Sequence, residues 1–221
     1  MATTMTDYAA EREAMVERQL KSRGITEKLI LDAFLEVPRE CFVSEEYAHL
    51  AYGDHPLPIE ANQTISQPYI VALMIQAAGI GLRDKVLEVG AGSGYAAAVI
   101  SRIAGQVIAI ERQHDLVEVA RERLKRLGFD NVDIVEGDGT KGCPDQAPFD
   151  AILAAASGSH VPKPLLDQLA PDGRIVMPIG SPGWAQELVK VTKRPDGTVA
   201  QENLGGVRFV PLIGEEGWKN A

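Results

Sequence analysis

At residues 85–94 the chain reads Lys85-Val86-Leu87-Glu88-Val89-Gly90-Ala91-Gly92-Ser93-Gly94. A short apolar strand with an acid near its end is followed by alternating glycines and then by an apolar helical run. Glycine lets a chain turn sharply and approach a ligand without a Cβ in the way, and the next helix offers N–H groups that no carbonyl pairs. The stretch therefore predicts a βα unit that binds a nucleotide-type cofactor.

The glycine spacing separates two classes of cofactor. A dinucleotide fingerprint has the spacing G-x-G-x-x-G or A, whereas Tyr95 occupies its last position here and the third glycine comes one residue earlier, at Gly94. NAD and FAD are therefore disfavoured. The order E-x-G-x-G-x-G instead resembles motif I of the class I S-adenosylmethionine-dependent methyltransferases, in which the loop faces the aminoacyl part of the cofactor and holds no pyrophosphate.

Length and charge limit the other possibilities. The chain has 221 residues, 45% of them apolar, which is enough for one well-filled domain. Its formal net charge is −9, and its lysines and arginines form no cluster of the kind that follows a phosphate backbone. We therefore expect no nucleic-acid partner. No residue pattern predicts a bound metal.

Compartment and assembly are inferred from what the chain lacks. Residues 1–20 have no uninterrupted apolar stretch like that of a signal peptide, and the longest apolar run, at 70–82, is too short to cross a bilayer. Cys41 and Cys143 have no C-x-x-C spacing, and we expect them to be reduced packing residues. These features predict a cytoplasmic protein that does not bind membranes. Nothing demands an oligomer, so we expect a monomer.

From residue 86 the sequence alternates between strands and helices. Near-continuously apolar strands alternating with helices predict an α/β fold, with a doubly wound, Rossmann-like sheet that is mostly parallel and covered on both faces. The expected strands are 86–89, 107–110, 132–135, 149–153 and 174–177, and the expected helices are 95–103, 116–127 and 164–169.

The two ends of the chain follow other patterns. An N-terminal helix is expected over 29–37, with Thr26 as its cap and Pro38 as its end, and a loop-like segment at 44–64 follows. After Gly180, the residues alternate as antiparallel strands at a sheet edge do. These strands are expected at 188–192 and 207–213. We predict a single domain over 1–221, with an N-terminal helical cap at 1–82, a cofactor-binding core at 83–180 and antiparallel strands at 181–221.

The ends of the strands carry the chemistry, because ligands of an open α/β sheet bind there. The first strand supplies Glu88 and the glycines. The second ends in Glu111, 21 residues after Gly90, where an acid would accept hydrogen bonds from both ribose hydroxyls unless it is a solvated acid beside Arg112. The third ends in Gly137-Asp138-Gly139, which suits an adenine amino group or an ordinary turn. Together, the strand ends favour a methyltransferase.

Several segments resemble one family, the protein-L-isoaspartate O-methyltransferases. Motif I is shared by all class I methyltransferases, whereas the segments 63–72 and 207–212 are far more specific. The resemblance runs in order from residue 15 to residue 212 and is close to full length. The matching segments are Met15–Leu20, Val37–Val43, Gln63–Ala72, Val86–Tyr95, Gly137–Gly139, Ala147–Ile152 and Val207–Leu212.

The resemblance implies an enzyme that methylates the α-carboxylate of L-isoaspartyl residues in damaged proteins. The ester would then cyclise to a succinimide, whose hydrolysis returns part of it to aspartate. Ser66 falls on the family's active-site serine, which implies that it is catalytic and contacts the substrate. The implied backbone contacts to the substrate peptide are at Val207, Arg208, Phe209, Val210 and Leu212. The implied contacts to S-adenosylmethionine are at Gln63, Thr64, Ile65, Glu88, Gly90, Gly92, Ser93, Gly94, Glu111, Asp138 and Gly139.

The residue types suit this chemistry. A carboxylate is ionised at neutral pH, so methyl transfer to it needs no base, only an oxygen held in line with the sulfonium methyl. A hydroxyl donor such as Ser66 suffices, although a serine before Gln67-Pro68 is equally suited to cap a helix. Recognition through the backbone suits an enzyme that must accept damage in many sequence contexts.

Two segments depart from the family pattern. Glu60-Ala61-Asn62 replaces glycine-rich residues, which predicts a stiffer loop, and Ala155-Ala156-Ser157-Gly158 lacks the usual threonine of Thr-Ala-Ala-Pro. His160 nearby is interpreted as a surface residue. Two alternatives stay open: a related methyltransferase that acts on another carboxylate or a small molecule, and a protein that binds S-adenosylmethionine without turnover.

Overall fold

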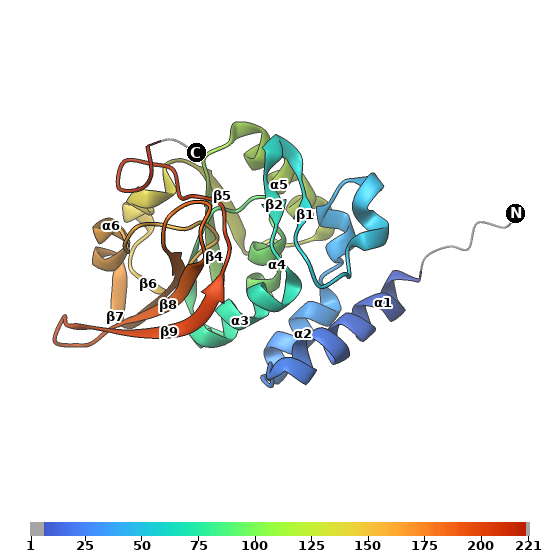
Figure 1. Cartoon of the computed structure of the whole chain (residues 1–221), viewed down its shortest axis with the longest axis horizontal. Helices are drawn as coiled ribbons and strands as arrows, with labels where there is room; N and C mark the ends of the chain where they lie inside the picture. The colour runs from blue at the N-terminus through green and yellow to red at the C-terminus, as the bar shows by residue number, and fades with distance from the viewer. Residues whose placement is uncertain (1–6, 220–221) are drawn as a thin grey trace, which may run out of the picture.

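The computed structural model describes residues 7–219 and places them in a mixed sheet flanked by helices (Figure 1). The seven-stranded sheet has the order β5-β4-β3-β6-β7-β8-β9, and β1 and β2 form a separate hairpin. The strands are β1 (Leu57–Pro58), β2 (Thr64–Ile65), β3 (Lys85–Val89), β4 (Gln106–Glu111), β5 (Val132–Glu136), β6 (Phe149–Ala154), β7 (Leu169–Ile179), β8 (Gln186–Lys193) and β9 (Val199–Val207).

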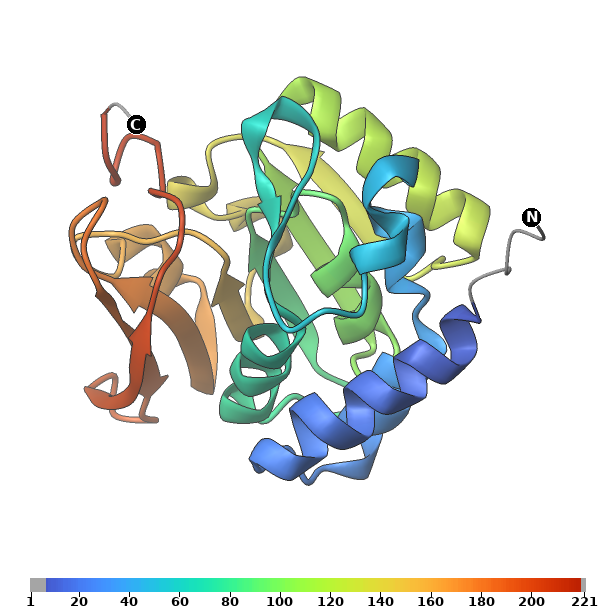
Figure 2. The same ribbon diagram turned by 45° about the vertical axis from the view of Figure 1, so that its right-hand side comes forward.

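Helices lie on both faces of this sheet, and the N-terminal helices of the chain pack beside it (Figure 2). The α-helices are α1 (Tyr8–Met15), α2 (Lys28–Glu36), α3 (Pro68–Ala78), α4 (Tyr95–Ser101), α5 (His114–Leu127) and α6 (Lys163–Asp167). The other helical turns are η1 (Val16–Leu20), η2 (Lys21–Arg23), η3 (Arg39–Phe42), η4 (Glu45–Leu50), η5 (Glu60–Asn62), η6 (Gly139–Lys141) and η7 (Pro144–Gln146).

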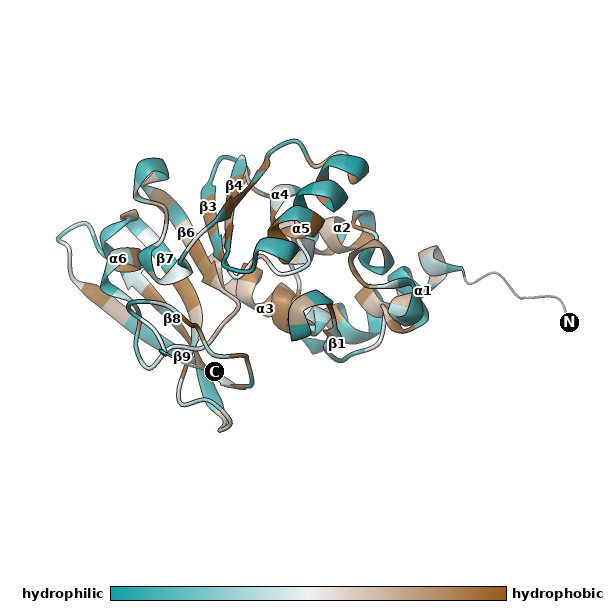
Figure 3. Ribbon diagram, turned by 90° about the horizontal axis from the view of Figure 1, so that it is seen from above, coloured by the Kyte–Doolittle hydropathy of each residue, from teal (hydrophilic) through white to brown (hydrophobic). Residues whose placement is uncertain are grey.

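Strands β5, β4, β3, β6 and β7 are parallel, as the alternation of the sequence predicts. In β3, Val86 lies opposite Val107 on one side and Ala151 on the other. These side chains are fully buried because helices cover both faces of the sheet. Figure 3 shows hydrophobic colouring on β3, β4 and β6, between the helices. The doubly wound fold is confirmed, and the carboxyl ends of the parallel strands lie at one edge.

The helix expected at 164–169 is shorter than predicted. α6 ends at Asp167, and Leu169 already belongs to β7, opposite Phe149 of β6. The carbonyl of Gln168 accepts a hydrogen bond from the N–H of Phe149 in β6 at 2.9 Å. The backbone therefore pairs with the sheet from this residue on, and the helix does not continue. A buried leucine fits the apolar face of either element, which is why periodicity misplaces this boundary.

The strand expected at 207–213 is wrong in all but its first residue. The last strand is β9, antiparallel to β8, and of the predicted stretch it contains only Val207. Its residues 201–203 are the polar Gln-Glu-Asn and are exposed, because β9 is an edge strand. Polar residues of this kind hide a strand from an apolar alternation pattern. Residues 208–213 instead run beside Ser157, past the carboxyl end of β6.

The N-terminal helix is confirmed as α2, but its cap is not Thr26. Glu27 precedes the helix, and no side chain caps it. The N–H of Thr26 instead donates to Oε1 of Gln76 in α3 at 3.1 Å, so this residue connects two helices. The segment 44–64, expected as a loop, contains η4, β1, η5 and the first residue of β2.

The N-terminal cap packs onto the sheet domain through aromatic side chains. The ring centroids of Phe34 and Phe42 lie 6.2 and 5.6 Å from that of Tyr95, the first residue of α4. All three side chains are buried, and burying one phenylalanine contributes roughly 1.5–3 kcal/mol. The cap and the helix after the glycine loop thus share one hydrophobic cluster, and Figure 2 shows the cap helices lying along this side of the sheet.

Other expectations concern thiols, membranes and metals. Cys41 and Cys143 are both free and half-buried, and His160 is exposed, as the sequence predicts. No helix within residues 7–219 is long and apolar enough to span a bilayer. In the same part of the chain, no group of three or more His, Cys, Asp or Glu side chains is placed to hold a metal ion.

Candidate active site

The loop between β3 and α4 adopts a backbone that requires glycine. The φ angles are 89° at Gly90, 54° at Gly92 and 87° at Gly94. All are left-handed, which costs a residue with a Cβ roughly 1–2 kcal/mol. The N–H groups of Gly90 and Ala91 donate to the carbonyl of Ile110 in β4, at 2.8 and 3.0 Å. The glycine loop is therefore held against the end of the neighbouring strand.

Glu111, at the end of β4, binds the glycine loop directly. Its Oε2 accepts from the N–H of Gly92 at 3.0 Å, and its Oε1 accepts from the N–H groups of Arg112 and Gln113 at 2.8 and 2.9 Å. The side chain is buried, and these donors compensate the burial of its charge. A carboxylate offers about four acceptor sites, so some remain for a ligand. This geometry suits the ribose hydroxyls that the sequence predicts here.

Glu88, at the end of β3, is also buried, and the backbone of Ala97 is the donor that acts on its carboxylate. Glu88 is 2% exposed, and its Oε2 has no hydrogen-bond partner among the described residues. Burial raises the pKa of Glu88 well above its usual value, and the negative charge of Glu111 raises it further. The fold therefore favours the uncharged acid at Glu88, whereas backbone donors compensate the carboxylate of Glu111.

Asp138 and Gly139 follow β5 as predicted, but the carboxylate already has partners. Oδ1 of Asp138 accepts from the N–H and the hydroxyl of Thr140 at 2.9 and 2.7 Å, and Oδ2 accepts from the N–H of Glu215 at 2.8 Å. Partial burial acts to raise the pKa of Asp138, but these hydrogen bonds leave it below its usual value. Gly139 leaves no room for a side chain, since a Cβ would lie 2.5 Å from Cγ1 of Val89.

A pocket of about 510 Å³ opens at the carboxyl ends of β4 and β5. Glu111 precedes the lining residue Arg112, and its carbonyl accepts from the N–H of another lining residue, Gly137, at 2.9 Å. Backbone groups, acids and one isoleucine side chain together offer hydrogen-bond acceptors and an apolar surface, which an adenine and its ribose require. The residues present therefore fit the adenosine part of S-adenosylmethionine. The lining residues are Arg112, Glu136, Gly137, Asp138, Ile213 and Gly214.

Ser66 follows the β1–β2 hairpin, which packs on the glycine loop. A Cβ at Gly92 would lie 3.5 Å from Cδ1 of Ile59 in the hairpin turn. α3 begins at Pro68 after Gln67, and no side chain caps this helix. The interpretation of Ser66 as a helix cap is therefore wrong. Within residues 7–219 its hydroxyl has no hydrogen-bond partner, although the residue is half-buried.

The other predicted cofactor residues lie in the same two loops. The carbonyl of Gln63 accepts from the N–H of Ile59 at 2.9 Å and closes the hairpin turn. Thr64 is exposed, whereas Ile65 is buried in the hydrophobic cluster. Ser93 is 3% exposed within the glycine loop. The structure thus brings the hairpin and the glycine loop together, although 27 residues separate Ile65 from Gly92 in the sequence.

Arg39 holds Ser66 in place, a role that the sequence does not reveal. Its side chain is fully buried, with Nη2 donating to the carbonyl of Ser66 at 2.9 Å and Nε to that of Ala51 at 2.8 Å. The guanidinium carbon lies 4.7 Å from the ring centroid of Tyr95. Burial lowers the pKa of Arg39, but an arginine still keeps its charge. The sequence signal is limited to two adjacent charged residues, Arg39 and Glu40, within an otherwise apolar segment.

Gln186 and Ser157 both hold the predicted substrate segment, 207–212. The side-chain amide of Gln186 donates to the carbonyl of Phe209 at 3.1 Å and accepts from its N–H at 2.7 Å. The carbonyl of Val210 accepts from the N–H of Ser157 at 2.8 Å, and the N–H of Leu212 donates back to the carbonyl of Ser157 at 2.8 Å. Ser157 belongs to the stretch that departs from the family pattern. That stretch therefore positions the C-terminal segment.

Comparison with known proteins identifies the family. The family model for protein-L-isoaspartate(D-aspartate) O-methyltransferase matches residues 10–217. Protein-L-isoaspartate O-methyltransferase 2 of Pelobacter propionicus is 52% identical over 207 residues, which cover 94% of this chain and 92% of the relative. Protein-L-isoaspartate O-methyltransferase 1 of Syntrophobacter fumaroxidans is 50% identical over 215 residues, which cover 97% of this chain and all of the relative.

Solved structures agree. A protein-L-isoaspartate O-methyltransferase aligns with a TM-score of 0.86 at 33% identity, over 93% of this chain and 67% of the other. A Plasmodium falciparum protein of the same kind, solved with S-adenosyl-L-homocysteine, aligns with a TM-score of 0.79 at 27% identity, over 94% and 99% of the two chains. The chain belongs to the protein-L-isoaspartate(D-aspartate) O-methyltransferase family and is an S-adenosylmethionine-dependent methyltransferase.

Proposed function

We propose that the protein repairs damaged proteins by methylating the α-carboxylate of L-isoaspartyl residues, with Ser66 orienting the acceptor. The observation that carries this proposal is the hydroxyl of Ser66, which has no hydrogen-bond partner among residues 7–219 and lies next to a hairpin that packs on the glycine loop. A family match over residues 10–217 supports the reaction.

The geometry of the strand ends supports the following roles for the cofactor residues. The glycine loop, with Glu88, Gly90, Gly92, Ser93 and Gly94, takes the aminoacyl part of S-adenosylmethionine. Glu111 accepts from the ribose hydroxyls, and the pocket beside Asp138 and Gly139 takes the adenine. Gln63, Thr64 and Ile65 close the site from the hairpin side. The bound cofactor supplies a methyl group activated by the sulfonium charge, so the protein has only to bind and orient.

Orientation of the acceptor is the task of Ser66. The acceptor carboxylate is already ionised at neutral pH, so it needs no base. The Ser66 hydroxyl donates a hydrogen bond to this carboxylate and fixes the direction of its oxygen. Arg39 holds the backbone of Ser66 and hence the origin of the side chain. Such positioning matters because a displacement of about 1 Å can cost about 100-fold in rate.

The substrate peptide binds through the backbone of 207–212. Among the hydrogen bonds of residues 7–219, none involves the N–H or carbonyl of Arg208 or the N–H of Val210, and both residues are exposed. Gln186 fixes Phe209 between them. Backbone hydrogen bonds to Arg208 and Val210 would hold an extended peptide whatever its side chains are. This mode suits a repair enzyme, because isoaspartate forms in many sequence contexts.

The decisive experiment uses two peptides that differ only in an aspartyl or an isoaspartyl linkage, incubated with S-adenosylmethionine labelled in the methyl group. Base-labile label should appear on the isoaspartyl peptide and leave as methanol as the ester collapses to succinimide. The aspartyl peptide should stay unlabelled. Equal labelling of both peptides would indicate a general carboxyl methyltransferase. Labelling of neither, with cofactor still bound, would point to another acceptor or to a binding protein without turnover.

The same proposal places the enzyme in the cytoplasm as a monomer that acts on proteins and not on nucleic acids. A net charge of −9 disfavours binding to a phosphate backbone, and the two free thiols suit a reducing compartment. Sedimentation at several protein concentrations tests the assembly state. A mass that rises to that of two chains would contradict the monomer.

A further inference from the structure

The β1–β2 hairpin has a turn that glycine would relax but that this chain builds without glycine. Leu57 pairs with Ile65 in the hairpin, and each strand has only two residues. Ala61 and Asn62 at the turn have φ of 54° and 56°, both left-handed. An isolated hairpin this short is marginal in water, and left-handed alanine is strained. The hairpin therefore needs an external contact to stay in this geometry.

Leu57 and Ile65 are buried in the hydrophobic cluster, and the turn itself is held by an ion pair between Glu60 and Arg123 in α5. Nη2 of Arg123 lies 2.7 Å from Oε1 of Glu60, and Nη1 lies 3.4 Å from Oε2, so the pair is bidentate. The side chains are 10% and 36% exposed. Figures 1 and 2 both show the hairpin beside α5. Bidentate geometry at low exposure distinguishes this pair from ordinary surface ion pairs, which contribute little.

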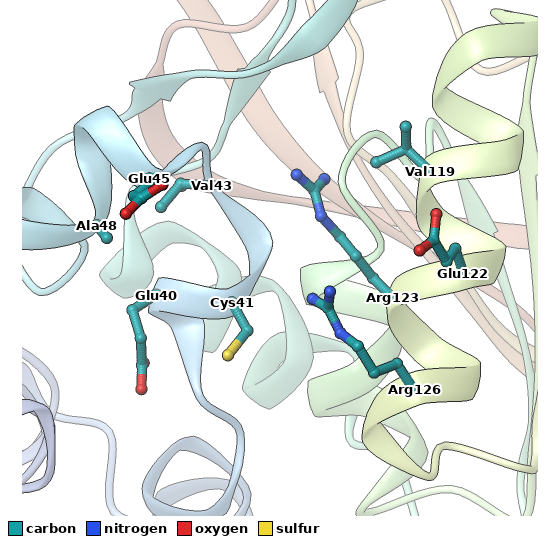
Figure 4. Close-up of a pocket in the computed structure, with 9 residues that line it drawn as sticks. All are labelled: Glu40, Cys41, Val43, Glu45, Ala48, Val119, Glu122, Arg123 and Arg126. Atoms are coloured by element: carbon teal, nitrogen blue, oxygen red, sulfur yellow. The ribbon is translucent and has the colours of Figure 1, made fainter.

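Arg123 lines a pocket, and the side-chain hydrogen bonds that it makes within residues 7–219 both go to Glu60. A pocket of about 470 Å³ separates α5 from η3 and η4, and Arg123 and Arg126 extend into it from α5 (Figure 4). Arg126 makes no ion pair within residues 7–219, although it carries the same charge on the same helix. Glu60 is thus the group that fixes the Arg123 guanidinium, and Arg126 is a matched control.

α5 supports the glycine loop as well as the hairpin. A Cβ at Gly94 would lie 3.3 Å from Cβ of Ala120 and 3.4 Å from Cδ1 of Leu124. Leu124 is the neighbour of Arg123 in the sequence, so one turn of α5 contacts both loops of the candidate site. The ion pair therefore sets the position of the hairpin relative to the glycine loop.

We propose that Glu60 and Arg123 are positioning residues, whose ion pair holds Gln63–Ser66 over the glycine loop in the geometry that binds cofactor and acceptor. The inference rests on the proposed roles of Gln63–Ser66. Without the ion pair, the hairpin samples other positions, and the apparent affinity falls by the fraction of molecules that keep the binding-competent one. Neither residue touches the reacting atoms.

A double-mutant cycle tests this inference. Glu60→Gln, Arg123→Gln and the double variant are compared with the control Arg126→Gln by calorimetry with S-adenosyl-L-homocysteine and by peptide kinetics. Each single variant should raise the dissociation constant and the KM for the isoaspartyl peptide about 3- to 10-fold, and the double variant should be no worse than either single one. Arg123→Lys should restore part of the affinity, and added salt should weaken binding in the wild type more than in the double variant.

Glu60→Gln should leave the fold intact, because Glu60 is partly exposed and glutamine is nearly isosteric with glutamate. A dissociation constant and KM that stay unchanged in folded Glu60→Gln and Arg123→Gln would overturn the proposal. An equal effect of Arg126→Gln would overturn it too, since that outcome reflects surface charge alone. If the dissociation constants for S-adenosyl-L-homocysteine follow the expected cycle but the protein does not methylate the isoaspartyl peptide, the positioning role is supported and the proposed substrate is refuted. The positioning role and the proposed substrate can therefore fail separately.

Discussion

The two sides of the candidate site are built in different ways. On the cofactor side, the groups belong to adjacent βα units, as when Glu111 accepts from the backbone of Gly92. On the acceptor side, single side chains connect segments that are far apart, as when Arg39 binds the carbonyl of Ser66 and Gln186 binds both backbone groups of Phe209. Local turns fix the cofactor side, whereas a few side-chain contacts fix the acceptor side.

This difference predicts which measured property each substitution should change. Segments held by few contacts open at lower free energy than segments held by a sheet and its turns. A change on the cofactor side should therefore alter cofactor affinity, while a change on the acceptor side should alter turnover or peptide KM and leave cofactor affinity alone. Substitutions that change both properties together would show that the two sides act as one unit.

The largest effect is expected from Glu111→Ala on the cofactor side. The change removes the acceptor proposed for the ribose, the hydrogen bond that holds Gly92 of the glycine loop, and the two hydrogen bonds from the N–H groups of Arg112 and Gln113. Lost hydrogen bonds to a charged group cost about 1.5–3 kcal/mol, so the dissociation constant should rise about 10- to 150-fold. Calorimetry with S-adenosyl-L-homocysteine measures it. Glu122→Ala, the same charge change on the exposed face of α5, is the control, and equal affinities in both folded variants would remove Glu111 from the site.

On the acceptor side, Ser66→Ala should reduce turnover by about 10- to 100-fold, because one donor to a charged oxygen is lost. Cofactor affinity and melting temperature should hardly change, since the hydroxyl has no partner within the described residues. Steady-state kinetics and thermal unfolding test the two parts. A variant that melts earlier yet retains full activity would return Ser66 to a structural role.

A smaller effect is expected from Gln186→Ala, which frees the backbone of Phe209. Two neutral hydrogen bonds are lost, so the KM for the isoaspartyl peptide should rise about 5- to 30-fold without a change in cofactor affinity. Gln201→Ala, at an exposed position of β9, is the matched control. A peptide KM that stays constant in Gln186→Ala would indicate that the peptide binds elsewhere.

Much of the cofactor side can be predicted from sequence because its residues are consecutive and their backbone needs are local. Glycine at 90, 92 and 94 follows from left-handed φ angles, and Glu111 and Asp138 each follow an apolar strand. A pattern does not reveal what else an acid binds. Asp138 accepts from Glu215, 77 residues away, and nothing in either segment indicates the pairing.

The acceptor side is harder to predict for the same physical reason. Arg39 and Ser66 are 27 residues apart, and Gln186 and Phe209 are 23 apart, so these contacts have no period that a sequence pattern can detect. Polar residues conceal the edge strand β9, which shifts the predicted strand onto the segment that follows it. The resemblance to a family points to 207–212 as a binding segment. The prediction that this segment forms a regular strand of the sheet is wrong beyond Val207.

The smallest effect is expected from Glu88→Gln. A neutral amide replaces an acid whose charged form is disfavoured because burial raises its pKa, so the cofactor dissociation constant should change by less than about 3-fold. The pKa of Glu88 is raised in the fold, so the folded protein binds a proton that the unfolded chain has released, and wild-type stability falls as pH rises above the usual value of 4.5.

The glutamine variant lacks this loss of stability. Its advantage over the wild type in urea unfolding should therefore grow between about pH 5 and pH 8. Urea titrations of both proteins at the two pH values measure this advantage, and calorimetry at the upper pH measures cofactor affinity. A fall in affinity of about 10-fold or more would mean that Glu88 acts as a charged ligand, because a loss of about 1.4 kcal/mol exceeds what exchanging one neutral group for another explains. The two acids beside the glycine loop would then have the same role, and the cofactor side would depend on both charges.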